Sequence, residues 1–205
     1  MKEIIITDNQ IRKMDRIFRI NLVNSIPGFK SANLLGTTNP SQNHNLAVFS
    51  SVIHLGSDPA LLGFILRPVT VNRHTYENIK RTNFYTINHI HESFIQKAHQ
   101  TSAKYPEEIS EFEQVGLTPE PWKGHPAPYV KESVIKIGME YLEEYDIKAN
   151  GTLLIVGMVR ELRIPSSIHL PDGSLDLTAA GTVTISGLNA YFRTQKIANL
   201  DYARP

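Results

Sequence analysis

The stretch from Lys30 to Asn88 decides the fold of this chain. It begins Lys30-Ser31-Ala32-Asn33-Leu34-Leu35-Gly36-Thr37 and, after a polar turn, continues Asn45-Leu46-Ala47-Val48-Phe49-Ser50-Ser51-Val52. It then passes Ser57-Asp58-Pro59, the apolar run 60–66, Arg67-Pro68 and Arg73-His74-Thr75, and closes with Phe84-Tyr85-Thr86-Ile87-Asn88. Apolar runs of strand length alternate with short polar clusters, a pattern typical of β-strands joined by turns.

Strand signals continue beyond this stretch. We expect strands over 31–38, 45–52, 60–66, 84–89, 134–145, 152–164 and 188–192, with a short one over 4–6 and with 60–66 buried on both faces. We expect helices over 9–18, 93–101 and 106–114 and a helix start near Thr75, whereas 178–186 fits either a strand or a helix. The proline-rich segment 117–128 contains Trp122 and is interpreted as an ordered surface excursion. At least six strands joined mostly by hairpin-length turns favour a mainly β, antiparallel barrel with short inserted helices.

Composition limits the classes of protein that fit. The chain has 205 residues, 41% of them hydrophobic, and we expect one domain over 1–205. Lys+Arg 21 against Asp+Glu 20 gives a net charge of +1, which provides no electrostatic argument for a nucleic-acid or membrane partner. The longest apolar runs, 60–66 and 153–159, fall far short of the roughly 20 residues of a membrane helix. No cysteine is present, which excludes disulfides and thiolate metal sites and fits the expected cytoplasmic location.

Signatures of several common active sites are missing. The sequence contains no GxGxxG, GxxxxGK[ST], HExxH or GxSxG pattern, so a Rossmann site and a P-loop are poorly supported. His89 and His91 are spaced to share one face of a strand, but two ligands do not make a metal site, and a solvated or dimer-contact pair is favoured. The acidic run containing Glu107, Glu108, Glu111 and Glu113 is interpreted as the solvated face of a helix. We therefore predict neither a metal site nor a catalytic side chain.

One cluster has clearer chemistry. Arg67, Arg73 and His74 are three groups able to carry positive charge, and Thr75 adds a hydroxyl at the start of a helix. Helix-start amides together with an arginine fork make a good phosphate site, although an ordinary basic surface loop fits the spacing equally well. Asn45, Ser50 and Ser51 offer donors and acceptors suited to the edge of a planar heteroaromatic ring, or are plain turn and strand residues.

Several of these patterns occur together in one family. The first is Gly36-Thr37 followed by 45–51, and the second is Ser57-Asp58-Pro59 before the strand that reaches Arg67. The third is Arg73-His74-Thr75 with Asn78-Ile79 and 84–88, and the middle segment is Ser110-Glu111-Phe112 with Gly116-Leu117. The last, near the C-terminus, comprises 155–159, Asp172-Gly173 and 187–191. In this order and spacing the chain resembles the flavin reductase-like, FMN-binding split-barrel family over about residues 21–191.

The resemblance implies a homodimeric split barrel related to a Greek key, with FMN, in preference to FAD, near the dimer interface. It implies that the isoalloxazine ring lies along β-strand 45–51 and near the facing main chain, and that the phosphate lies at the helix start. The implied cofactor-binding residues are Lys30, Ser31, Ala32, Asn33, Asn45, Val48, Phe49, Ser50, Ser51, Arg67, Arg73, His74, Thr75 and, more weakly, Lys104. Many members have a hydroxyl residue where Phe49 stands and a second proline where Ala60 stands. Phe49 is therefore expected to affect substrate access more than FMN binding.

Three functions follow as hypotheses. The first is an oxidoreductase in which NAD(P)H passes hydride to the flavin N5, with oxygen, free flavin, ferric iron or a partner oxygenase as the acceptor. The second is a binding or electron-carrier protein that holds FMN on the same barrel without turnover. The third is a barrel interaction module with no cofactor. No acid–base residue is needed for the first, which is consistent with a sequence that shows no catalytic constellation.

Overall fold

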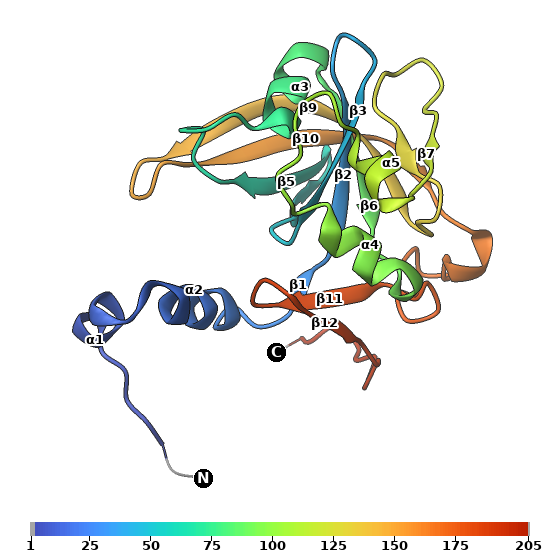
Figure 1. Cartoon of the computed structure of the whole chain (residues 1–205). Coiled ribbons are helices and arrows are strands. Elements are labelled where there is room, and N and C mark those ends of the chain that lie inside the picture. The colour runs from blue at the N-terminus through green and yellow to red at the C-terminus, as the bar shows by residue number, and fades with distance from the viewer. Residues whose placement is uncertain (1–2, 205) are drawn as a thin grey trace.

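The computed structural model describes residues 3–204, and its main element is a seven-stranded antiparallel sheet (Figure 1). The strands lie in the order β3 (His44–Phe49), β2 (Asn33–Thr38), β6 (Phe84–His89), β9 (Lys136–Ile147), β10 (Thr152–Arg163), β5 (Ala60–Leu66) and β4 (Ile53–Ser57). A three-stranded sheet joins β1 (Lys30–Ser31), β11 (Val183–Ser186) and β12 (Ala190–Arg193), and β7 (Pro119–Glu120) pairs with β8 (Tyr129–Val130). The predicted mainly β, antiparallel architecture is confirmed.

The large sheet curls until its two edges approach each other. A flat sheet of seven strands would hold its edges about 29 Å apart, at about 4.8 Å per neighbouring pair. The edge strands β3 and β4 are joined by residues 50–52 alone, which span at most about 14 Å between Phe49 and Ile53. The sheet must therefore close on itself, leaving a gap between β3 and β4.

Alternation along β2 separates two cores. Leu34 packs in a cluster with Leu46, Phe94, Phe112 and Ile185, on the side covered by α4 (Ile95–Gln100), α5 (Glu111–Val115) and β11. Leu35 points the other way, into a cluster with Phe64, Ile79, Tyr85 and Ile155. β2 thus lies between the two cores, and its residues 33–38 are all buried.

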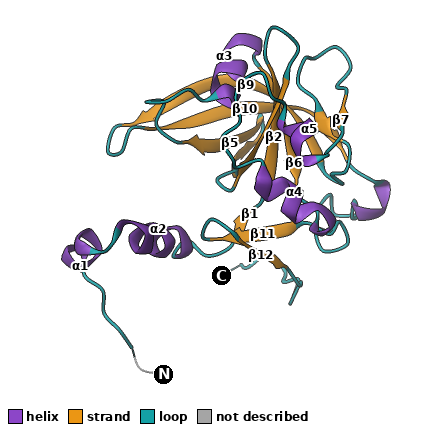
Figure 2. Ribbon diagram, in the orientation of Figure 1, coloured by secondary structure: helices purple, strands orange, loops and turns teal. Residues whose placement is uncertain are grey.

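Helix α3 (His74–Thr82) lies against β2 and β3 (Figure 2). It buries Ile79 in the second core, and its Asn78 side chain donates to the Thr37 hydroxyl of β2 at 3.1 Å. It ends at Asn83, which adopts the left-handed conformation with φ 62°. The predicted helix start near Thr75 is confirmed: α3 begins at His74, one residue before Thr75.

The N-terminal segment forms an arm that projects away from the sheet (Figure 1). It contains α1 (Asp8–Lys13), capped by Thr7 and Gln10, and α2 (Arg16–Ser25), capped by Asp15, and neither helix has a buried residue. The single helix expected over 9–18 is wrong, because Asp15 takes the amides of Ile17 and Phe18 and starts a second helix. The strand expected over 4–6 is also wrong, since these residues have no regular structure.

Other boundaries differ from the sequence prediction. The strand expected over 45–52 ends at Phe49, and β4 was missed. The helix expected over 106–114 covers only α5, which begins after Ser110 and ends at Gly116, whose φ is 65°. The segment expected as buried on both faces, β5, is exposed or half-buried over its first three residues. Within 178–186 only β11 is a strand.

The remaining helical pieces are η1 (Glu92–Phe94) and η2 (Ser166–Ile168). Trp122 is 3% exposed, so the proline-rich segment is ordered as predicted. Among residues 3–204, no helix is long and apolar enough to cross a membrane.

Candidate functional site: the β3 edge and the start of helix α3

The free edge of β3 presents backbone groups that no strand occupies. The Leu46 amide donates to a carboxylate oxygen, Oε2 of Glu111, at 2.9 Å, so it points away from β2. In an antiparallel pair, backbone groups alternate between the two sides of a strand. The amide and carbonyl of Val48 therefore also point away from β2, toward the gap. Such an edge can pair with the polar rim of a planar ligand as it would with another strand.

A side-chain hydrogen bond connects this edge strand to α3. The Asn45 amide nitrogen donates to the hydroxyl of Thr75 at 3.1 Å and to that of Thr37 at 3.3 Å. Thr75 is 6% exposed and lies in the first turn of α3. The two halves of the predicted site, the ring-facing strand and the phosphate-facing helix start, are thus brought into direct contact.

The start of α3 has the chemistry of an anion site. Its N-cap is Arg73, whose side chain makes no capping hydrogen bond to the amides of the first turn. The Arg73 guanidinium makes two long contacts of 3.4 Å, from Nε and Nη2, to the carbonyl of Pro68. His74 is half-buried and Arg67 exposed. Unfilled helix-start amides beside two arginines and a histidine fit a phosphate group.

The connection between β3 and β4 is fixed by Ser51. Its hydroxyl accepts from the Ile65 amide and donates to the Ile65 carbonyl, both at 3.1 Å, and so joins this connection to β5 across the gap. Phe49 packs edge-on against Phe64, with ring centroids 5.1 Å apart. Its side chain therefore lies against the second core, while Ser50 and Val48 remain half-buried.

The segment preceding β2 is held from several directions. Lys30 donates through Nζ to the carbonyls of Asn24 and Gly187, at 3.2 and 3.1 Å, and burial lowers its pKa. Ser31 donates to the Val52 carbonyl at 3.3 Å and accepts from the buried Asn33 side chain at 3.0 Å. Ala32 is fully packed in the first core. The ammonium of Lys30 is thus engaged by backbone carbonyls, so this segment would face a ring through its main chain.

Lys104 is the remaining predicted residue. It is exposed in the turn after α4, and within residues 3–204 the structure shows no hydrogen bond from it to β3 or α3. Among the predicted residues, side-chain hydrogen bonds join Asn45 with Thr75 and Ser31 with Asn33, and Asn33 stands opposite Phe49 in the β2–β3 pairing.

Sequence reasoning missed Glu111. It was interpreted as part of a solvated acidic face, but it is 6% exposed and binds the β3 edge. Burial raises the pKa of Glu111, while the Leu46 amide and the positive field of His74 lower it. The available signal was its position directly after Ser110, a preferred helix cap, and next to the buried Phe112.

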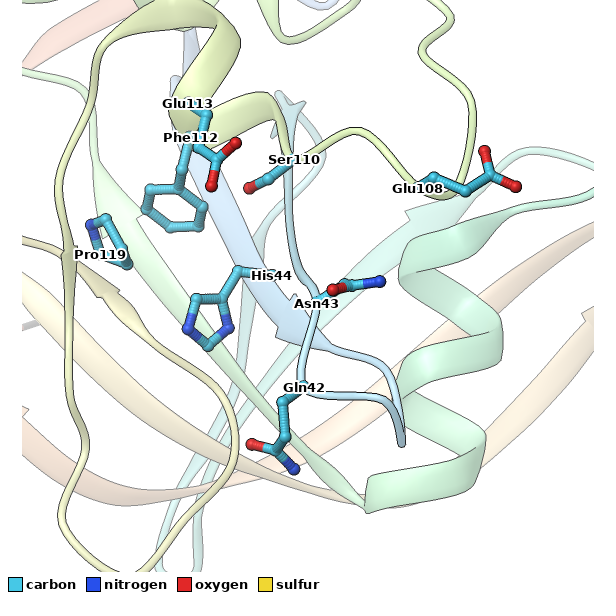
Figure 3. A pocket seen from close by; sticks show the side chains of 8 residues that line it. All are labelled: Gln42, Asn43, His44, Glu108, Ser110, Phe112, Glu113 and Pro119. Carbon is cyan, nitrogen blue, oxygen red and sulfur yellow. The ribbon is translucent and has the colours of Figure 1, made fainter.

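A small cavity of about 130 Å³ lies between the β2–β3 turn and α5 (Figure 3). His44 and Phe112 face it, with ring centroids 6.2 Å apart. Thr38 donates its hydroxyl hydrogen to Pro126, so the 2.8 Å contact to His44 Nδ1 requires Nδ1 to be protonated. None of the predicted cofactor residues lines this cavity, so it is separate from the site described above.

The histidine pair does not form a metal centre. His91 accepts from the Ser93 amide through Nδ1 and so caps η1. Burial lowers the pKa of His89 to about 4, and its Nδ1 has no partner within the described residues. No group of three or more metal-ligating side chains occurs among residues 3–204.

Comparisons with known proteins agree with this fold. A sequence model described as the flavin reductase like domain matches residues 26–177. A protein from Aquifex aeolicus of uncharacterised function is 30% identical over 108 residues, which cover 50% of this chain and 55% of that protein, so the match spans about half of this curated relative.

Solved structures are similar over almost the whole chain. One described as a flavin reductase with a split barrel domain, from Shewanella frigidimarina, is 43% identical, with a TM-score of 0.94 over 98% of this chain and 100% of that one. Nitrilotriacetate monooxygenase component B from Bacillus cereus has a TM-score of 0.84 at 16% identity, over 98% and 100% of the two chains, which shows the shared fold alone. The chain belongs to the flavin reductase like domain family, and its fold is the split barrel.

Proposed function

We propose that this protein binds FMN and acts as an NAD(P)H-dependent flavin reductase or a related oxidoreductase. The observation that carries the proposal is the hydrogen bond from Asn45 to Thr75, which joins an open strand edge to a basic helix start. One element suits the rim of a planar ring and the other suits a phosphate, as FMN requires. Membership of the family supports the same cofactor class.

Different residues would bind the phosphate and the ring of FMN. First-turn amides of α3, with Arg73, His74 and Thr75, would hold the phosphate, and Arg67 would add charge at the rim. Outward main-chain groups at Val48, with the main chain of 30–33, would orient the ring. Acceptance of hydride from NAD(P)H and release of electrons would be supplied by the bound flavin. The protein needs no acid or base of its own for this, and its groups bind and orient.

The proposed partners include a second copy of the chain. Strands β10, β5 and β4 lie side by side at one end of the sheet, and apolar side chains lie on their face turned away from the second core. Ile53 and Leu55 are 45% and 39% exposed there, and Leu55 and Leu154 lie on the same side of Gly63. Such a face is typical of an interface between subunits. A partner oxygenase as electron acceptor is a further proposal, supported by the monooxygenase component among the structural neighbours, and we propose a cytoplasmic location.

An absorbance spectrum and FMN titration test the proposal. The purified protein should quench FMN fluorescence on binding, and anaerobic addition of NADH or NADPH should remove the visible absorbance of the bound flavin. Charge-assisted hydrogen bonds contribute roughly 1.5–3 kcal/mol, so Arg73→Ala should weaken FMN binding by about tenfold or more.

Arg81→Ala, at the exposed last turn of the same helix, is the matched control and should leave the affinity unchanged. Absence of any FMN affinity would exclude the proposed function. Tight FMN binding without reduction by either nucleotide would instead identify an FMN-binding carrier, and preferential binding of FAD would correct the cofactor.

A further inference from the structure

Glu111 occupies a position that links both halves of the candidate site. It is the first residue of α5, yet its carboxylate reaches β3, 65 residues earlier in the chain, and accepts the Leu46 amide at 2.9 Å. The side chain is 6% exposed, so the carboxylate is held away from water by the packing of α5 on β3. Burying a carboxylate is costly unless hydrogen bonds compensate. A buried carboxylate at the unpaired edge of β3 therefore suggests a specific role for Glu111.

The contact fixes the backbone on which a ring would lie. β3 is an edge strand, so its outward amides have no partner strand, and Glu111 satisfies the one at Leu46. The next outward amide is that of Val48, two residues along the same edge. Holding the Leu46 backbone in place therefore also fixes the position and direction of the Val48 amide and carbonyl, which point toward the gap.

The position of β3 that Glu111 holds is next to the residue that contacts the phosphate end of the site. The charge of His74, the first residue of α3, acts on Glu111 and lowers its pKa, in opposition to the larger effect of burial. Asn45, next to Leu46, hydrogen-bonds to Thr75 of that helix. Glu111 and Asn45 thus tie neighbouring positions of β3 to two different helices.

We propose that Glu111 is a positioning residue of the flavin site: its carboxylate accepts the Leu46 amide, holds the β3 edge in register with the start of α3, and so presents the Val48 backbone to the ring. The proposal rests on the proposed function for the identity of the ligand. The hold on the strand is a property of the chain itself and is testable without FMN.

Three substitutions separate the hydrogen bond from the charge. Glu111→Gln keeps an acceptor oxygen at the same reach without the charge, Glu111→Asp keeps the charge but withdraws the oxygens by one methylene, and Glu111→Ala removes both. Glu113→Ala, on the same helix, is the matched control, since Glu113 is exposed. Each is compared with the full-length wild-type chain by hydrogen exchange of the Leu46 amide without ligand, by FMN fluorescence quenching, and by the visible spectrum of bound FMN.

We expect the Leu46 amide to exchange at least about tenfold faster in Glu111→Ala and Glu111→Asp, since its hydrogen bond to the Glu111 carboxylate is lost. FMN affinity should fall by about tenfold or more in these two variants, with an altered spectrum of the bound flavin, and should stay within about threefold of wild type in Glu111→Gln and Glu113→Ala.

The proposal is overturned if folded Glu111→Ala shows wild-type Leu46 exchange and FMN affinity, or if Glu111→Gln loses as much affinity as Glu111→Ala. If Glu111→Ala does not fold, the Gln and Asp pair decides in the same way. A wild-type chain that does not bind FMN defeats the proposed function, whereas the exchange comparison still reports whether Glu111 holds the strand.

Discussion

The two edge strands of the large sheet, β3 and β4, are consecutive in the sequence but differ in their surroundings. All six residues of β3 are buried or half-buried, and three helices, α3, α4 and α5, contact the strand. Four of the five residues of β4 are exposed, and Ile53 and Leu55 are its large apolar side chains. As edge strands, both have one row of backbone amides and carbonyls that is not paired with another strand.

The difference shows two ways of managing a sheet edge. On β3, Glu111 of α5 accepts the outward Leu46 amide, and the Asn45 side chain of the strand is bonded to Thr75 of α3. β4 is short and left open, with an apolar outer face that suits a second copy of the chain. Under the proposed function, the β3 edge would receive a small molecule and the β4 edge a second copy of the chain.

Two glycines provide the strongest test of this contrast. In Gly36→Ala, beside β3, the new Cβ would lie 2.4 Å from the Pro128 carbonyl oxygen and 2.6 Å from the Thr86 hydroxyl. Thr86 donates to that carbonyl, so both packing and a buried hydrogen bond would be lost. We expect the free energy of unfolding to fall by about 2–4 kcal/mol.

The matched change on the open edge is Gly56→Ala in β4, where the nearest atom would be 3.3 Å away. It should cost less than about 1 kcal/mol in urea unfolding. Equal losses of unfolding free energy in the two variants would contradict the expectation that Gly36 is more tightly packed than Gly56.

A smaller effect is expected from Ser51→Ala. This change leaves the Ile65 amide and carbonyl without their shared partner and should lower the free energy of unfolding by about 1–3 kcal/mol. Ser57→Ala removes the exposed contact of Ser57 with His54 on β4 and should stay within about 0.5 kcal/mol of wild type. Thermal unfolding of both variants measures the difference, and a larger loss in Ser57→Ala would reverse the comparison.

The smallest effect on stability is expected from Ile53→Lys. The side chain is 45% exposed, so unfolding of the isolated chain should change by no more than about 0.5 kcal/mol. Association of two copies should nevertheless weaken by about tenfold or more, because the interface would have to bury a charge.

Sedimentation at several protein concentrations measures this, with Thr178→Lys, an exposed turn residue, as the control. Unchanged sedimentation of Ile53→Lys, or a monomeric wild-type protein, would remove β4 from any self-association surface.

Local pattern was sufficient for several elements of this fold. The bounds of β5 and β6 match the apolar runs that predicted them, and α3 begins one residue before Thr75. These features depend on periodicity, turn residues and helix starts, which can be seen within a few residues. The family resemblance, and not the local pattern, placed Asn45 and Thr75 in one site, and the structure joins them by a hydrogen bond.

The interactions that complete the site have no local signal. Ser51 and Ile65 are 14 residues apart, and Glu111 and Leu46 are 65 apart, so both contacts depend on the closure of the sheet. An acidic residue on a short helix is ordinarily solvated, and only the packing of α5 on β3 reveals that Glu111 is buried. Phe49, which is expected to affect substrate access, packs its ring against Phe64 of β5, a contact that also depends on the closure of the sheet.

The pairing of β1 with β11, in which Lys30 stands opposite Ile185, bears on the order in which the chain acquires its structure during synthesis. At about 5–20 residues per second, the ribosome needs roughly 8–31 s to progress from one of these residues to the other. During most of that interval β1 lacks its partner strand β11, although β2, β3 and α3 follow β1 closely in the chain. The strand pairing that fixes Lys30 and Ser31 is therefore completed late in synthesis, after the other elements of the candidate site have emerged.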